Sequence, residues 1–188
     1  MKKKFELIEI KSPHPQMSFS LLKEKCESHG IEMGIANVDE FNFELCEQAD
    51  AIKVPIYTSS EIYPNLTSLT LPVQNMGVFD VIFKQEGQIF PRIIMFEAFT
   101  EMLAQTKSYL DLRKPAYIVG DQSLARVALG VLTHIGLSRI FIYGTNTSSI
   151  EAIVKNYTKQ NFSLNIEIHP LSEITQNQEI GGVLVNTE

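Results

Sequence analysis

The strongest constraint on the fold of this chain is a strand, turn and helix pattern in its C-terminal half. The short apolar run Ala116–Val119 ends in Gly120, which predicts a buried strand that enters a tight turn. Apolar residues then recur at spacings of three and four as far as Ile135. This spacing predicts a helix that Ser123 caps and Gly136 ends.

A second strand and a second helix repeat this pattern. The apolar residues 139–143 predict the strand, and Ser148 with Glu151 predicts a capping box at the start of the helix. Because strands alternate with helices, the segment predicts an α/β fold with a parallel sheet.

The turn after the first of these strands matches part of the dinucleotide-binding fingerprint. That fingerprint needs a glycine for the turn, a second where the backbone approaches the pyrophosphate, and a third glycine or an alanine for helix packing. Gly120 and Ala125 meet the first and last requirements. Gln122 instead puts a long side chain in the phosphate position, and Asp121 adds negative charge beside it. We therefore expect poor phosphate binding by the candidate cofactor residues here, which are Gly120, Gln122, Ser123 and Ala125.

The ribose anchor of such a site is expected after the second strand. An acidic residue there is typical of NAD binding, and an arginine is typical of NADP binding. Gly144, Thr145 and Asn146 supply neither, although Thr145 and Asn146 remain candidate cofactor contacts. Two interpretations stay open, a weak nucleotide site and a strand and helix unit kept only for packing.

Composition excludes several classes of function. A net charge of -6 over 188 residues, without a large basic cluster, argues against nucleic-acid binding. No apolar run approaches the roughly 18 residues of a membrane span. The two cysteines and four histidines have no metal-site spacing, so we expect no metal and a reducing, cytoplasmic environment.

The N-terminal half predicts a second α/β unit. Strands are predicted at 5–10, 31–38 and 51–54, and helices at 18–29 and 40–48. The order is again strand, helix, strand, helix, strand.

An antiparallel pair is predicted to close this first sheet. Beyond a loop that contains Pro64 and Pro72, strands are expected at 77–83 and 88–94, joined by the hairpin residues 84–87. The first sheet is therefore predicted to be mixed.

A helix over 96–112 is predicted to connect the two halves. The expected division is a substrate-type domain at 1–97, the connecting helix at 98–114 and a shortened Rossmann-like domain at 115–188.

Several short motifs resemble those of the shikimate dehydrogenase family, and the resemblance extends over essentially the whole chain. Ser18-Phe19-Ser20 resembles the family's Ser-x-Ser element after the first strand. Residues 51–57 resemble its Asn-Val-Thr-x-Pro-x-Lys element, and residues 77–80 resemble its Gly-Ala-Val-Asn strand. Residues 184–187 resemble the strand before its nicotinamide-side loop, and the glycine turn at Gly120 completes the set.

The resemblance implies two small α/β domains, NADP as cofactor and a shikimate-like hydroxy acid as substrate, in aromatic amino acid biosynthesis. It also implies that the substrate-binding residues are Ser18, Ser20, Lys53, Tyr57 and Asp80. The family's catalytic lysine position holds Tyr57, and its catalytic aspartate position holds Met95. Tyrosine is a weak base at neutral pH and methionine transfers no proton, so proton handling is expected to be lost.

Three functions follow as hypotheses. The first is a shikimate dehydrogenase-like protein that has lost oxidoreductase activity and binds a small ligand or a protein partner. The second is an active NAD(P)-dependent oxidoreductase on shikimate, quinate or a related hydroxy acid, in which Lys53 and Glu97, or Tyr57, handle the proton. The third is an assembly protein, a homo-oligomer included, without a ligand.

Overall fold

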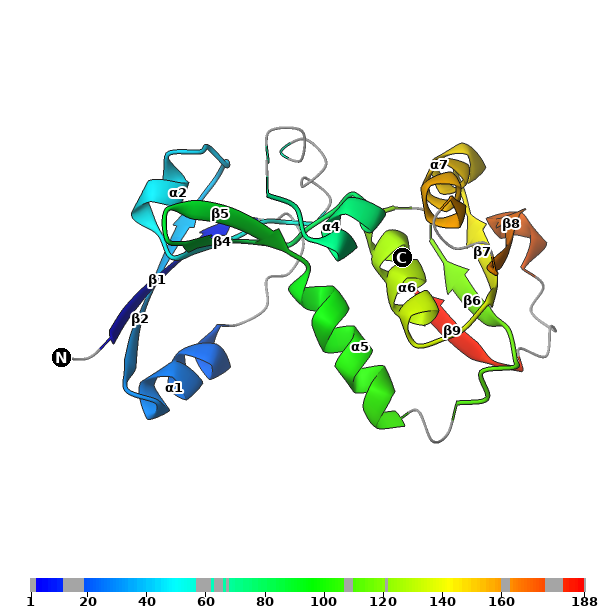
Figure 1. Ribbon diagram of the computed structural model, residues 1–188, viewed down its shortest axis with the longest axis horizontal. Helices are drawn as coiled ribbons and strands as arrows, with labels where there is room; N and C mark the ends of the chain where they lie inside the picture. Colours follow the sequence, from blue (N-terminus) through cyan, green and yellow to red (C-terminus); the bar gives the residue numbers. More distant parts are fainter. Residues whose placement is uncertain are drawn as a thin grey trace. The chain divides into compact units, whose positions relative to one another are not determined.

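A computed structural model describes residues 3–11, 19–56, 62, 66, 68–106, 110–120, 122–159, 163–174 and 181–187, without the side chains of residues 20, 21, 153 and 156. The chain forms two compact units, each built around its own sheet (Figure 1). The first unit comprises 1–70 and 79–92, and the second comprises 71–78 and 93–188. The elements are β1 (Lys3–Ile10), α1 (Ser20–Ser28), β2 (Ile31–Val38), α2 (Leu45–Gln48), β3 (Ala51–Lys53), α4 (Leu71–Met76), β4 (Val81–Gln85), β5 (Gln88–Arg92), α5 (Ile94–Thr106), β6 (Ala116–Val119), α6 (Ser123–His134), β7 (Arg139–Gly144), α7 (Thr147–Thr158), β8 (Asn165–Pro170), the 3-10 turn η3 (Leu171–Glu173) and β9 (Val183–Asn186).

Sheet A, in the first unit, has the strand order β2-β1-β3-β4-β5. Strand β1 runs parallel to β2 and β3, whereas β4 is antiparallel to both β3 and β5. Phe19 and Cys26 bring α1 onto one face of this sheet, where they pack against buried Leu7, Met33 and Ala51. The predicted mixed sheet is confirmed.

The turn of the hairpin between β4 and β5 consists of two residues. Glu86 and Gly87 have φ angles of 52° and 77°. Two consecutive left-handed residues form the tight turn whose twist matches an antiparallel pair. The hairpin predicted at 84–87 is present with a shorter turn. Strand β4 begins at Val81 rather than at residue 77, because Gly77, with a φ of 65°, follows the end of a helix.

That helix, α4, replaces the loop that the sequence predicts around Pro72. Pro72 lies in the first turn, where a missing N–H removes no helical hydrogen bond. Val73 and Met76 are buried, and α4 packs on α6 and α7 of the second unit. A side chain at Gly130 of α6 would meet Met76 and Tyr157, so glycine allows this close packing.

Sheet B, in the second unit, has the order β8-β7-β6-β9 with every pair parallel. Helix α6 packs on β6, and α7 packs on β7 and β8. The strand residues Ala116, Ile118, Ile140 and Ile142 are almost completely buried. The predicted parallel sheet is confirmed, and β8 is a strand that was not predicted from the sequence.

The C-terminus of α6 has the predicted glycine. Gly136 has a φ of 103° and donates its N–H to the carbonyl oxygen of Thr133 at 3.1 Å. Leu137 donates to the carbonyl oxygen of Leu132 at 3.0 Å. These two bonds form a Schellman motif, in which the glycine adopts the left-handed conformation.

The helix starts differ from the predictions by one or two residues. Ser123 is the first residue of α6, and the N-cap is Gln122, whose side chain makes no capping bond. The N-cap of α7 is Asn146 rather than Ser148, because the Asn146 Oδ1 accepts the N–H of Ser149 at 3.1 Å. An asparagine here provides the same bond as a serine, so several polar residues in a row leave the start ambiguous.

The limits of other elements shift as well. Of the helix predicted at 40–48, only α2 forms, whereas β2 has the predicted limits. Helix α5 ends at Thr106 and belongs to the second compact unit, whereas the sequence predicts a separate connector at 98–114. No helix among the described residues is long and apolar enough to cross a membrane.

Candidate functional site

The carboxyl edge of sheet A brings together most of the polar candidates of the first unit. Glu9 pairs in register with Asn37 on one side and with Lys53 on the other. The same row continues through Val81 to Arg92. Residues paired across a sheet point to the same face. One face of the sheet therefore has four polar groups at its carboxyl edge, namely the amide of Asn37, the carboxylate of Glu9, the ammonium group of Lys53 and the guanidinium group of Arg92.

The centre of this row is an ion pair between Glu9 and Lys53. The Lys53 Nζ lies 4.0 Å from the Glu9 Oε1, and the exposed fractions of the two side chains are 34% and 4%. Burial raises the pKa of the Glu9 carboxyl group, and the positive charge of Lys53 opposes this effect less strongly. The pair thus combines a desolvated carboxylate with a cation that solvent reaches.

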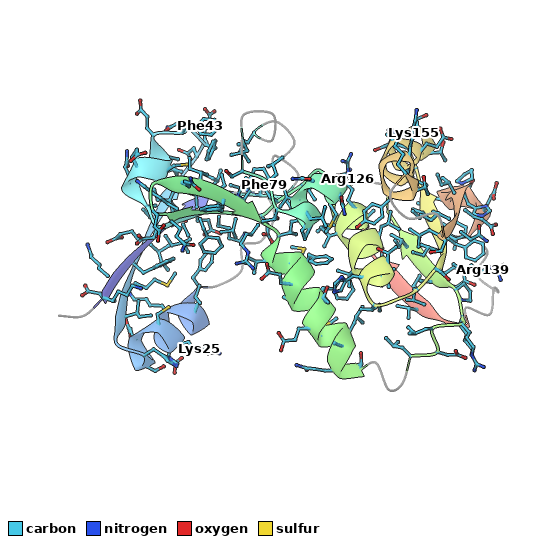
Figure 2. All side chains as sticks on the ribbon, viewed as in Figure 1. Lys25, Phe43, Phe79, Arg126, Arg139 and Lys155 are labelled. Carbon is cyan, nitrogen blue, oxygen red and sulfur yellow. The ribbon has the colours of Figure 1, made fainter. Side chains whose placement is uncertain are left out.

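The remaining substrate candidates lie at or near this edge, or outside the described residues. Asp80 directly precedes β4 and is buried, beside the fully buried Phe79 that Figure 2 labels. Its N–H donates to the carbonyl oxygen of Arg92 at 3.1 Å. Ser20 begins α1, but its side chain is outside the described set, as are Ser18 and Tyr57.

Glu9, Asn37 and Arg92 are the residues of this row that sequence reasoning missed, and Glu9 is the one that is buried. In the sequence it is one of two glutamates in an apolar strand, which indicates only a half-exposed strand. Its burial distinguishes it from Glu6, whose side chain is 39% exposed and pairs with Lys4. The signal that could have found it was the position of Glu9 at the carboxyl end of a parallel strand.

The turn between β6 and α6 forms the corresponding edge of sheet B. Gly120 has a φ of 132°, in a region that favours glycine, and donates its N–H to the carbonyl oxygen of Tyr143 at 2.8 Å. Ala125 is buried, as the packing position of a dinucleotide turn requires. Gln122 is exposed at the N-cap with a φ of -110°, so its backbone does not itself require glycine. Asp121 is outside the described residues.

The candidate ribose contacts follow β7. Asn146 uses its Oδ1 to cap α7, as described above, and Thr145 is exposed beside it. Across the sheet, Thr187 donates both its N–H and its hydroxyl to the carbonyl oxygen of Val119, at 2.9 and 2.8 Å. Thr187 therefore covers the carboxyl end of β6, next to the point where β9 joins the sheet on the opposite side from β7.

Two further polar groups in the second unit were not predicted. Arg126 on α6 is half-buried, and its Nη1 donates to the carbonyl oxygen of Met76 at 3.4 Å (Figure 2). Burial lowers the pKa of this guanidinium group. His169 on β8 lies 3.0 Å from the Glu173 Oε2 and stacks on Tyr143. Among the described residues, no group of three or more acidic, histidine or cysteine side chains could hold a metal ion.

The fold is similar to solved dehydrogenase structures. The chain superposes on the ligand-free 5-ketofructose reductase of Gluconobacter sp. strain CHM43 with a TM-score of 0.79 and 15% identity, covering 99% of this chain and 69% of that one. The quinate dehydrogenase from Corynebacterium glutamicum in complex with NAD gives 0.78 and 10%, covering 100% and 71%. The shikimate 5-dehydrogenase from Thermus thermophilus in complex with NADP(H) and shikimate gives 0.69 and 17%, covering 99% and 68%.

These likenesses show the fold. No family model and no curated protein matches the sequence. The chain spans about two thirds of the length of the structures it matches, between 62% and 71%. The predicted two-domain shikimate dehydrogenase-like architecture is confirmed, with a mixed sheet in one unit and an all-parallel sheet in the other.

Proposed function

We propose that the protein binds a small hydroxy acid at the carboxyl edge of sheet A and transfers no hydride. The observation that carries this proposal is the pairing of Lys53 with the buried Glu9. The partly exposed ammonium group of Lys53 suits a ligand carboxylate. Glu9 accepts hydrogen bonds when ionised, which suits a ligand hydroxyl group.

Neighbouring residues favour the same class of ligand. Asn37 and Arg92 belong to the same face of the same edge as the ion pair. A guanidinium group binds a carboxylate through two parallel hydrogen bonds, and an amide can both donate to and accept from hydroxyl groups. Ligands in open α/β sheets bind outside the carboxyl ends of the strands. The solved shikimate dehydrogenase with bound shikimate makes a hydroxy acid the natural first probe.

Three residues favour the absence of hydride transfer: Gln122 and Asn146 beside the expected cofactor position, and Met95 in place of a catalytic aspartate. Gln122 occupies the N-cap of α6, where the backbone donors of the first turn would meet a pyrophosphate. Asn146 uses its side-chain oxygen within the protein. Met95 stands where the resemblance places an aspartate. Loss of the proton-handling pair alone removes about 10²–10⁴-fold in rate.

Thermal shift and isothermal titration calorimetry with shikimate, quinate, NAD and NADP test the proposal. A ligand that binds only the native state raises its stability. We expect saturable binding of shikimate or quinate, no binding of NADP, and no NADPH formation at high substrate concentration. Lys53→Met should weaken hydroxy-acid binding by about tenfold or more, because one charge-assisted contact is lost.

Lys84→Met is the matched control. Lys84 belongs to the same sheet, is 27% exposed and pairs with Glu47 at 2.8 Å. Its loss should leave hydroxy-acid binding unchanged. If the native protein and the Lys53→Met variant bind the hydroxy acid with equal affinity, the proposed site is excluded. Saturable NADP-dependent turnover would exclude the proposal that the protein transfers no hydride.

One observation favours the second candidate function, that of an active NAD(P)-dependent oxidoreductase. A lysine and carboxylate pair, Lys53 and Glu9, exists within the first unit and can serve the proton-handling role that the hypothesis gives to Lys53 and Glu97. If this pair handles the proton, Glu9→Gln must abolish hydride transfer in a protein that binds NADP. The calorimetry above separates the two functions.

A further inference from the structure

Strand β2 forms an open edge of sheet A. It pairs with β1 over all eight of its residues, and within the described part of the chain no other strand pairs with it (Figure 1). The chain crosses between the two units after β3, before β4 and after β5. Strand β1 therefore separates β2 from every strand that leads into the second unit. An open edge presents main-chain groups to which another strand can bond.

The other edge strands are shorter, and two of them contain a proline. Strands β5, β8 and β9 have five, six and four residues, whereas β2 has eight. Pro91 lies within β5 and Pro170 ends β8, and a proline has no N–H to donate. Strand β2 contains neither proline nor lysine, the residues by which natural edge strands prevent pairing. Among the edges of the two described sheets, β2 is the one suited to receive a further strand.

One hydrogen bond shows which main-chain groups of β2 point outward. Lys11 donates its N–H to the carbonyl oxygen of Val38 at 2.9 Å, so the main-chain groups of Val38 point toward β1. The N–H and C=O of one strand residue point the same way, and this direction alternates from residue to residue. The four odd-numbered residues of β2 therefore point their main-chain groups away from β1, namely Ile31, Met33, Ile35 and Asn37.

We propose that β2 is a dimerisation edge, which pairs antiparallel with β2 of a second copy of this chain about a two-fold axis at Gly34. In this register Ile31 stands opposite Asn37, and Met33 stands opposite Ile35. Every residue that points outward then exchanges hydrogen bonds with its partner. The two five-stranded sheets become one continuous sheet, with both copies of α1 on the same face.

The side chains of a second copy suit this register. Ile35, which is 36% exposed, meets Met33 of the other copy, and apolar cross-strand pairs stabilise a sheet. Glu32, the only ionisable residue of β2, stands opposite Ala36 rather than opposite a second carboxylate. Gly34 meets Gly34, so no side chain separates the two backbones at the axis. Such a symmetric pair closes on itself, which prevents the open-ended growth that an apolar edge risks.

Charges beside the axis are compensated within each copy. Glu6 of β1 lies against Gly34 on the face opposite α1, and it pairs with Lys4. On the other face, α1 packs on β2 and carries two lysines and two glutamates, so it adds no net charge. The net charge of -6 of the chain is therefore not concentrated at this edge.

Sedimentation velocity over a range of protein concentrations tests the proposal. We expect a reversible dimer of the native protein. Ile35→Lys should weaken the dimer about tenfold or more, because two charges then replace apolar contacts at the edge. Leu184→Lys is the matched control, since Leu184 is an exposed apolar residue, at 51%, of the edge strand β9. It should leave the dimer unchanged, and circular dichroism should show that both variants remain folded.

Cysteine cross-linking tests the register. Residue 32 of one copy stands opposite residue 36 of the other in a pair without mutual hydrogen bonds, whose Cα atoms lie about 4.5 Å apart, within reach of a disulfide. Two variants are compared, both with Cys26→Ser to remove the half-buried native thiol. The variant with Glu32→Cys and Ala36→Cys should form a covalent dimer under mild oxidation. The variant with Ala36→Cys alone should remain a single chain on a denaturing gel, because its cysteine stands opposite Glu32.

The proposal is overturned if the native protein is a monomer at every concentration, or if the Ile35→Lys variant dimerises as tightly as the native protein. A dimer that Leu184→Lys dissociates would place the contact at β9 instead. Equal cross-linking of the single and the double cysteine variant would overturn the proposed register.

Discussion

Glu9 illustrates how strand register changes the meaning of a single residue. In the sequence, Glu6 and Glu9 are equivalent interruptions of an apolar strand. In the fold, Glu6 pairs with Lys4 near the surface, whereas Glu9 is buried at the carboxyl end of β1 beside Lys53. Desolvation disfavours the ionised carboxylate, and a partly exposed lysine at 4.0 Å compensates for this incompletely.

Glu9→Gln should change the pH dependence of stability. Burial raises the pKa of Glu9, so between the ordinary glutamate pKa and the raised value the folded state holds a proton that the unfolded state has lost. The free energy of unfolding of the native protein therefore falls as pH rises through this window. Relative to the native protein, Glu9→Gln should gain on the order of 1 kcal/mol at pH 7 and nothing below about pH 4.

Urea denaturation of both proteins across this pH range provides the measurement. Glu47→Gln is the control, since Glu47 is paired with Lys84 but 78% exposed, and its effect should be within about 0.5 kcal/mol at every pH. A Glu9→Gln variant less stable than the native protein at pH 7 would show that the ion pair outweighs the desolvation of the carboxylate.

At the scale of elements, backbone packing decides details that periodicity does not encode. The end of α6 was predictable because Gly136 has a specific backbone role. The entry of β9 into sheet B depends instead on a close approach. A Cβ on Gly182 would overlap the carbonyl oxygen of Pro115, whereas a Cβ on the adjacent Gly181 has the Lys114 Nζ as its nearest neighbour, at 3.9 Å.

Gly182→Ala should destabilise the protein by about 2 kcal/mol or more, because the methyl group forces β9 away from the chain that leads into β6. Gly181→Ala is the matched control and should change stability by less than about 0.5 kcal/mol. Thermal or urea unfolding gives both values. Similar stabilities for the two variants would mean that residues 181–182 move freely enough to remove the overlap.

At the scale of the whole molecule, the chain leaves the first unit and returns to it. Residues 71–78 contribute α4 to the second unit, and residues 79–92 then complete sheet A with its hairpin. The second unit therefore depends on a helix that lies in the N-terminal half of the sequence. Val73 of that helix and Val54 after β3 are both completely buried, one in each unit.

Val73→Ala and Val54→Ala should each cost about 1–3 kcal/mol, since each leaves a cavity in a packed core. Their effects should differ in location. Hydrogen exchange should accelerate in α6 and α7 for Val73→Ala, and in β1, β3 and β4 for Val54→Ala. Identical exchange patterns in the two variants would show that the two units unfold together and would contradict this prediction.

The sequence predicts several residues of the candidate site, but it does not predict their contacts. The glycine turn at Gly120 was identified because a special backbone position leaves a local signal, and Lys53 was named from its place four residues before Tyr57 in the stretch that resembles the family's lysine motif. The pair of Lys53 and Glu97, which belongs to the alternative function, stays a prediction, whereas the carboxylate that lies beside Lys53 in sheet A, Glu9, was not predicted. A partner on a neighbouring strand depends on register, which no local pattern specifies.

The sequence by itself determined the alternation of strands and helices, the parallel and mixed sheets, and the glycine that ends α6. These features follow from periodicity and backbone conformation over a few residues. Only the tertiary structure decided that Glu9 lies beside Lys53 and that α4 packs with the second unit. Burial and pairing between distant segments arise from the packing of the chain as a whole.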